Sequence, residues 1–177
     1  MNKNIEDRIY TLLKEMVAVD SVSYSDKECA MSEYVHAAFA RIPYFKSHPD
    51  QFGLHPIPND PFGRTVPYGL ILGNSSNTVV SMGHTDVVST ESYGELAEQA
   101  FRIGDELEKA LAKKDLSPEA RVELESGEWI WGRGVADMKG GVAMHLALFE
   151  EYAALAEKGE LPGNLLMITV PDEESYS

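Results

Sequence analysis

The chain has 177 residues, a length that suits one domain with a sizeable core and argues against a second complete one. Fifteen Lys and Arg against 29 Asp and Glu give a formal net charge of −14. This charge repels phosphate backbones and anionic lipid surfaces, so we expect neither nucleic acid nor a membrane among the partners. Cys29 is the single cysteine, and the sequence opens without the apolar run of a secretory signal. We therefore expect a cytoplasmic protein.

Helical spacing of apolar residues predicts the first two elements. Residues 4–19 have the pattern of an amphipathic helix, and a second such helix is expected up to about Arg41, capped by Ser25 and Asp26. Residues 42–65 are rich in Pro, Gly, His and Asp and are expected to hold at most one short strand. Two β-like runs follow, at 68–72 and 78–82.

The second half of the chain begins with a segment of different composition. Residues 89–127 are highly charged and helical in pattern, and we expect them to form a surface insertion within a single domain, 1–177. A short strand at 128–131, a glycine-rich turn and a helix over about 140–158 should follow. The predicted buried side of that helix is Met144, Leu146, Leu148, Phe149 and Tyr152.

The last predicted element is an apolar run at 164–170, which indicates a buried central strand. Strands that alternate with helices predict an α/β layered domain, and such domains bind ligands at the carboxyl ends of their strands. Polar clusters occupy these places in the sequence. The first is G-H-T-D-V-V, in which His84 and Asp86 point to the same side of an extended backbone. Asp86 could orient a metal-bound imidazole, and the alternative is a structural His with a hydrogen-bonded Asp.

The other two clusters supply carboxylates. In W-G-R-G-V-A-D-M-K-G-G (131–141), Asp137 stands just before a helix, where it could bind a cation or cap the helix. A phosphate-binding loop does not fit, because its motif is missing and Asp137 would repel phosphate. Asp172, Glu173 and Glu174 follow the apolar strand, where the alternative is a solvated acidic tail. One imidazole and several carboxylates together suit zinc, and also cobalt or manganese.

Taken in order, these motifs resemble the co-catalytic zinc hydrolases of the aminoacylase, carboxypeptidase G and succinyl-diaminopimelate desuccinylase family. S-G-E-W (126–129) and the charged insertion are most similar to the RocB group of arginine-degradation proteins. The resemblance implies a three-layer α/β/α catalytic domain of the zinc-exopeptidase type with a mixed, mostly parallel sheet. Residues 1–177 would be the N-terminal part of that domain, truncated and lacking the family's lid domain.

The resemblance also implies a role for each motif residue. His84 would bind one of two divalent metal ions, Asp137 would bridge both, and Glu174 would bind the other. Glu173 would be the general base for the attacking water, and Asp86 would orient His84. The expected function is metal-dependent hydrolysis of amide or peptide bonds, in the class of N-acyl amino acids or small peptides. The alternative is a non-enzymatic interaction or regulatory fragment that retains the motifs.

Three further expectations follow from the family and from the length of the chain. The family implies a cis peptide bond at Asp137–Met138. Each metal ion would keep only two protein ligands here, so we expect weak or absent metal binding and no activity from the 177 residues alone. An apolar strand at 165–170 that lacks a neighbour would favour a homodimer or a strand-exchanged oligomer.

Overall fold

A mixed sheet of four strands forms the frame of the chain in the computed structural model, which describes residues 3–176. The strand order is β1-β2-β4-β3, with bounds Phe52–Pro56 (β1), Thr65–Ile71 (β2), Thr78–His84 (β3) and Asn164–Val170 (β4). The prediction that the run at 164–170 forms a central strand is confirmed.

The pairing of the strands corrects one expectation. β2 is antiparallel to both β1 and β4, whereas β3 is parallel to β4. The sheet is therefore mixed, as predicted, but it is not mostly parallel within the described strands. A short loop joins β1 to β2 and makes them a hairpin, while a helical crossover joins β3 to β4 and makes them parallel.

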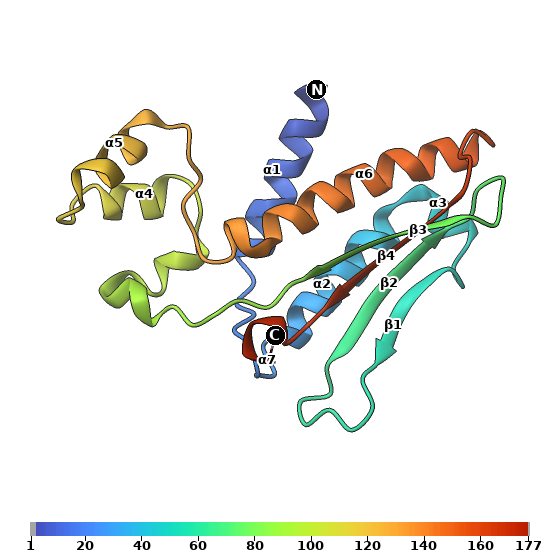
Figure 1. The fold of residues 1–177 in the computed structure, drawn as a ribbon, viewed down its shortest axis with the longest axis horizontal. Helices are drawn as coiled ribbons and strands as arrows, with labels where there is room; N and C mark the ends of the chain where they lie inside the picture. Colours follow the sequence, from blue (N-terminus) through green and yellow to red (C-terminus); the bar gives the residue numbers. More distant parts are fainter. Residues whose placement is uncertain (1–2, 177) are drawn as a thin grey trace.

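The long helices lie on one face of this sheet (Figure 1). Their bounds are Lys3–Val17 (α1), Glu28–Arg41 (α2) and Gly140–Glu157 (α6). All three were predicted, but Ser25 and Asp26 do not cap α2 through their side chains. A short helix, α3 (Pro43–Ser47), was missed in the segment where only a strand was expected.

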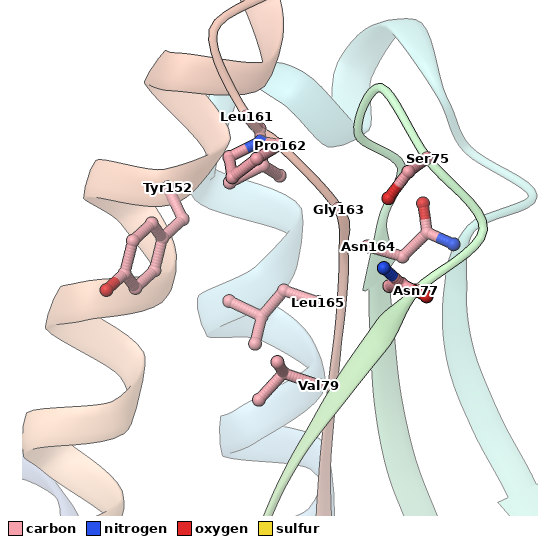
Figure 2. Close-up of a pocket in the computed structure, with 9 residues that line it drawn as sticks. All are labelled: Ser75, Asn77, Val79, Tyr152, Leu161, Pro162, Gly163, Asn164 and Leu165. Carbon is pink, nitrogen blue, oxygen red and sulfur yellow. The ribbon is translucent and has the colours of Figure 1, made fainter.

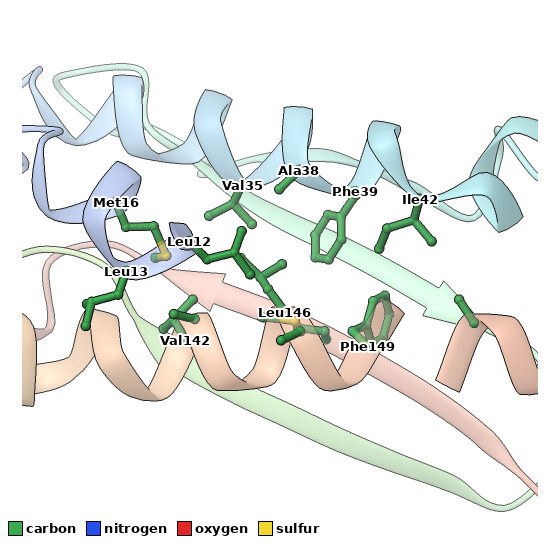
Figure 3. Packing of buried hydrophobic residues seen from close by; sticks show 14 of the residues in the cluster. Leu12, Leu13, Met16, Val35, Ala38, Phe39, Ile42, Val142, Leu146 and Phe149 are labelled. Carbon is green, nitrogen blue, oxygen red and sulfur yellow. The ribbon is translucent and has the colours of Figure 1, made fainter. Parts of the chain in front are cut away.

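Aromatic side chains fill the space between α2, α6 and the sheet (Figure 3). The ring centroids of Phe39, Phe45 and Phe149 lie 5.5–6.0 Å apart. Gly69 of β2 lies beneath these rings, and a Cβ there would come within 3.1–3.2 Å of each of them. The absence of a side chain at Gly69 thus allows the helices to approach the strands closely.

Helix α6 buries only part of the side that was predicted, because Leu146 and Phe149 are buried as expected but the other three residues are not. Met144, Leu148 and Tyr152 are exposed. The buried residues are Val142, Ala143, Leu146, Ala147, Phe149 and Ala153. The helix is apolar almost all round, so its periodicity does not distinguish the packed side from the exposed one. Gly159, two residues after the end of the helix, has a φ of 71°, a conformation that favours glycine at this position.

The opposite face of the sheet is uncovered within residues 3–176. Residues paired across neighbouring strands project from the same face, and two apolar rows result: Tyr68, Ile168 and Met82, and Leu70, Leu166 and Val80. The Val80 and Met82 side chains on edge strand β3 are 56% and 60% exposed. The described residues thus provide two of the three layers that the family resemblance implies.

The charged segment before α6 projects away from the sheet (Figure 1). It contains short helical elements: Glu91–Leu96 (η1), Gln99–Phe101 (η2), Asp105–Leu111 (α4) and Pro118–Ser126 (α5). The prediction of a strand at 128–131 is wrong, because this stretch pairs with no neighbouring strand and leaves Trp129 and Ile130 exposed to solvent. No helix in the described part of the chain is long and apolar enough to cross a bilayer.

Candidate metal centre

The parallel pair β3 and β4 brings two of the polar clusters together. His84 is the last residue of β3 and is paired with Val170, the last residue of β4. The acids Glu173 and Glu174 begin a short helix, α7 (Glu173–Tyr176), three residues after β4 ends. Both clusters therefore lie at the carboxyl ends of neighbouring strands, as the sequence predicts.

Asp137 reaches the same place from the turn before α6. This turn, η3 (Val135–Lys139), follows Gly134, which has a φ of 75°. The peptide bond between Asp137 and Met138 is cis, as the family resemblance implies. The Asp137 carboxylate faces His84, with 2.9 Å between Oδ1 and Nε2.

His84, Asp137 and Glu174 converge although they come from separate segments. Each offers one ligand atom, and these atoms all lie within 4.8 Å of one another. An Oε2 atom of Glu173 lies 3.7 Å from His84 Nε2, and its side chain remains 45% exposed. The arrangement brings together all four of the residues for which the family resemblance implies metal binding or proton transfer.

Asp86 lies behind the His84 ring and is fully buried. Its backbone carbonyl lies 3.2 Å from His84 Nδ1 and its Oδ1 lies 3.4 Å from the same atom. Its Oδ2 accepts hydrogen bonds from Ser23 Oγ at 2.6 Å and from the Glu174 backbone N–H at 3.0 Å. Asp86 thus holds the imidazole and the turn that carries Glu174 in fixed relation.

The ring nitrogens of His84 both face acceptors. Because a carbonyl can only accept, Nδ1 carries a proton, and Nε2 points at the Asp137 carboxylate. Burial by itself would lower the pKa of His84, but the hydrogen bond to Asp137 and the charge of Asp86 raise it above its ordinary value. With Nδ1 held by Asp86, Nε2 is the nitrogen that can exchange its proton for a metal ion.

Negative charge is concentrated at this site. Burial raises the pKa of Glu174, and the nearby Asp137 carboxylate raises it further. The site therefore combines one imidazole with carboxylates that repel one another. A divalent cation would relieve this repulsion, and nitrogen and oxygen donors in this combination fit zinc, cobalt or manganese.

Lys139 also shapes the site, and sequence reasoning assigned it no role. Its side chain is fully buried, and Nζ donates to the carbonyls of Met16 at 3.1 Å and Val19 at 2.8 Å. Burial lowers the pKa of this ammonium group to about 7, although the negative charges of Asp20 and Asp86 act to raise it. Lys139 ties the turn that carries Asp137 to the end of α1. The sequence feature that could have pointed to Lys139 is its place two residues after Asp137 in a glycine-rich motif.

An apolar pocket lies at the other end of the sheet (Figure 2). Its lining includes Val79, Tyr152 and Leu165, near the starts of β3 and β4. A seven-residue strand at about 3.3 Å per residue places this pocket roughly 20 Å from His84. The pocket is therefore separate from the polar cluster.

Comparison with known proteins agrees with the geometry. Residues 80–177, more than half of the chain, match the sequence pattern of the Peptidase family M20/M25/M40. The chain is 40% identical to the uncharacterized protein YqjN of Bacillus subtilis and 33% identical to Protein RocB of the same organism, over 100% and 97% of its length. It is 28% identical, over 98% of its length, to a succinyl-diaminopimelate desuccinylase of Ruthia magnifica.

The chain spans about a third of the length of these relatives, covering 31%, 30% and 36% of them. Solved structures match its fold over nearly all of its residues. Human carnosine dipeptidase 1 matches 99% of the chain with a TM-score of 0.65 at 19% identity, and the match covers 34% of that protein. An M20 family metallo-carboxypeptidase from Sulfolobus solfataricus matches 98% of the chain with a TM-score of 0.61 at 20% identity, which is 32% of that protein. The sequence match over residues 80–177 and the shared fold together show that this chain belongs to the Peptidase family M20/M25/M40.

Proposed function

We propose that this chain provides part of the active site of a metal-dependent hydrolase of amide or peptide bonds. The observation that carries the proposal is the convergence of His84, Asp137 and Glu174 within 4.8 Å at the carboxyl ends of β3 and β4. The dipeptidase, desuccinylase and carboxypeptidase named among the relatives support the same class of reaction. N-acyl amino acids and small peptides are the proposed substrate class.

In this proposal His84, Asp137 and Glu174 would hold the divalent ions, with Asp137 as the shared ligand. Zinc is the proposed metal, with cobalt or manganese as substitutes. Ions held by these residues would supply a water molecule of lowered pKa and a polarised scissile carbonyl. Asp86 keeps the His84 ring in the tautomer that presents Nε2.

Glu173 is the proposed general base. Its carboxylate lies beside His84 Nε2 but remains open to solvent, so it can reach both a water molecule and a substrate in the site. It would accept the proton of the attacking water and deliver it to the leaving amine. Since it is adjacent to Glu174, a small change in the turn after β4 would move the base and a metal ligand together.

The described residues do not complete such a site. His84, Asp137 and Glu174 would give each of two ions only two protein ligands if Asp137 were shared, whereas catalytic zinc has about three. We therefore propose that residues 1–177 form the N-terminal part of a catalytic domain, with 89–127 as an insertion, and that they bind metal weakly and are inactive alone.

The open face of the sheet supports a proposal about assembly. The edge strand β3 exposes Val79 on one face and Val80 and Met82 on the other, and exposed apolar edges promote pairing between chains. We propose that the isolated chain forms a homodimer or a strand-exchanged oligomer through β3.

The free thiol of Cys29 supports a cytoplasmic location, which cell fractionation would test.

The function is tested by amine release from a panel of N-acyl amino acids and dipeptides. The assay uses protein expressed from its full reading frame and loaded with zinc or manganese. Glu173→Gln should lower kcat by about 10²–10⁴-fold while metal binding is retained, because it removes only the base. Full activity of this variant would contradict the role of Glu173. Metal binding without hydrolysis of any of these substrates would favour a non-enzymatic function.

A further inference from the structure

A buried ionic cluster lies beside the turn that carries the acid pair. Arg64, the last residue before β2, is 5% exposed, and its Nη1 donates to Glu28 Oε1 at 2.8 Å. Its Nε and Nη2 donate to Asp60 Oδ1 at 2.9 and 2.6 Å. Nη2 also donates to Asp172 Oδ2 at 3.2 Å. One guanidinium group therefore joins α2, the β1–β2 loop and the residue just before Glu173.

Glu28 reaches the same turn by a second route. Its Oε2 accepts a hydrogen bond from the backbone N–H of Asp172 at 2.8 Å. Asp172 has a φ of 66°, a conformation that few residues other than glycine adopt without support. The side chain of Asp172 is thus held by Arg64 and its backbone by Glu28.

The cluster rests on a rigid base. Asp60 Oδ2 accepts hydrogen bonds from the backbone N–H groups of Phe62 at 3.0 Å and Arg64 at 2.8 Å, which closes the β1–β2 loop around the guanidinium. Asp60 and Glu28 are both buried against Arg64. Charged groups buried this deeply are costly to separate, so the cluster restricts the movement of Asp172, which it contacts.

We propose that Arg64 and Glu28 are positioning residues, which hold Asp172 so that Glu173 and Glu174 face His84 and Asp137. The inference rests on the proposed function, since it assigns these residues to the support of its metal site. On the far side of the turn, the Glu174 N–H donates to Asp86 Oδ2. The turn is therefore fixed from both sides, by Glu28 and Arg64 through Asp172 and by Asp86 through Glu174.

The test uses Glu28→Gln, which keeps the shape of the side chain, and Arg64→Met as a stronger change. Glu150→Gln is the matched control, because it removes an ion pair between Arg8 and Glu150 that also joins distant segments but lies on α1 and α6. The first readout needs no metal: amide hydrogen exchange at Glu174 reports whether its hydrogen bond to Asp86 persists. We expect about tenfold faster exchange in Glu28→Gln and no change in Glu150→Gln.

The second readout is cobalt affinity, measured by absorption titration. Loss of a residue that supports a metal ligand typically lowers affinity about 10–100-fold, and we expect that loss for Glu28→Gln. In a Glu174→Ala background the same substitution should lower affinity no further, since it acts through Glu174. A purely structural role would add its loss in both backgrounds.

The outcomes separate the two proposals. If the wild-type chain binds no cobalt, the proposed metal site fails, and amide exchange at Glu174 still decides the positioning role. If Glu28→Gln exchanges at Glu174 as slowly as Glu150→Gln does, the positioning role is overturned. The same follows if its effect on cobalt affinity persists in the Glu174→Ala background.

Discussion

Replacement of Gly134 by alanine should destabilise the chain by a predictable amount. Gly134 has φ 75° and ψ 5°, and an added Cβ would lie 2.4 Å from Cγ1 of Val87. Val87 cannot move aside easily, because it is fully buried, its N–H donates to Ser21 O at 3.0 Å and its carbonyl accepts from Ser23 N at 3.0 Å. The substitution therefore forces a shift in the turn that carries Asp137 or in the segment that carries Asp86.

The expected loss has two parts. A left-handed backbone costs about 1–2 kcal/mol for a residue with a Cβ, and overpacking a rigid site costs about 1–3 kcal/mol, so Gly134→Ala should lose about 2–5 kcal/mol. Gly159→Ala isolates the first part, because Gly159 has a φ of 71° and a Cβ added there would meet no other atom within 4 Å. Its expected loss is about 1–2 kcal/mol.

Urea unfolding followed by circular dichroism measures both variants. The midpoint should fall without a change in the slope, and it should fall further for Gly134→Ala than for Gly159→Ala. Equal losses would show that the turn around Gly134 accommodates a methyl group. The close approach of Gly134 to Val87 would then play no part in shaping the site.

Three further predictions concern charge and assembly. A proton on His84 Nε2 competes with a metal ion, so metal affinity should fall about tenfold for each pH unit below the raised pKa of His84, as calorimetry at several pH values would show. A pH-independent affinity would exclude His84 as a ligand. Lys139 has a pKa of about 7 when folded and 10.5 when unfolded, so the unfolded chain binds more protons between these values. Stability should therefore rise with pH across that window by up to about 1.4 kcal/mol per pH unit, and Lys139→Met should remove this rise in urea unfolding. The double variant Val80→Lys and Met82→Lys should reduce the mass measured by light scattering, and a wild-type chain that stays monomeric at high concentration would contradict self-association.

Sequence patterns predicted correctly those parts of the molecule whose structure is determined by residues close together in the chain. The helix α1, the central strand β4 and the placement of polar clusters at the ends of β3 and β4 all follow from short runs whose chemistry is specific. The strand pattern at 128–131 failed because a strand also needs a partner, and none lies beside it. The prediction for the buried side of α6 holds for Leu146 and Phe149 but fails for Leu148, because an apolar residue fits either side of that helix equally well.

The support of the site could not be predicted in the same way. Arg64 contacts Glu28 and Asp172, which are 36 and 108 residues away in the chain. Each of these residues by itself has the pattern of an ordinary surface charge, and only the folded chain brings them together. The antiparallel pairing of β2 with β4 is likewise a long-range choice that the local pattern of alternation does not specify.

Zinc titration by calorimetry tests the central claim most directly, on the wild-type chain and on Asp137→Ala. Asp50→Ala serves as control, since it removes an exposed acid outside the polar cluster. We predict weak, saturable zinc binding by the wild type and by Asp50→Ala, and none by Asp137→Ala. Equal zinc binding by Asp137→Ala and the wild type would contradict a metal site built on Asp137.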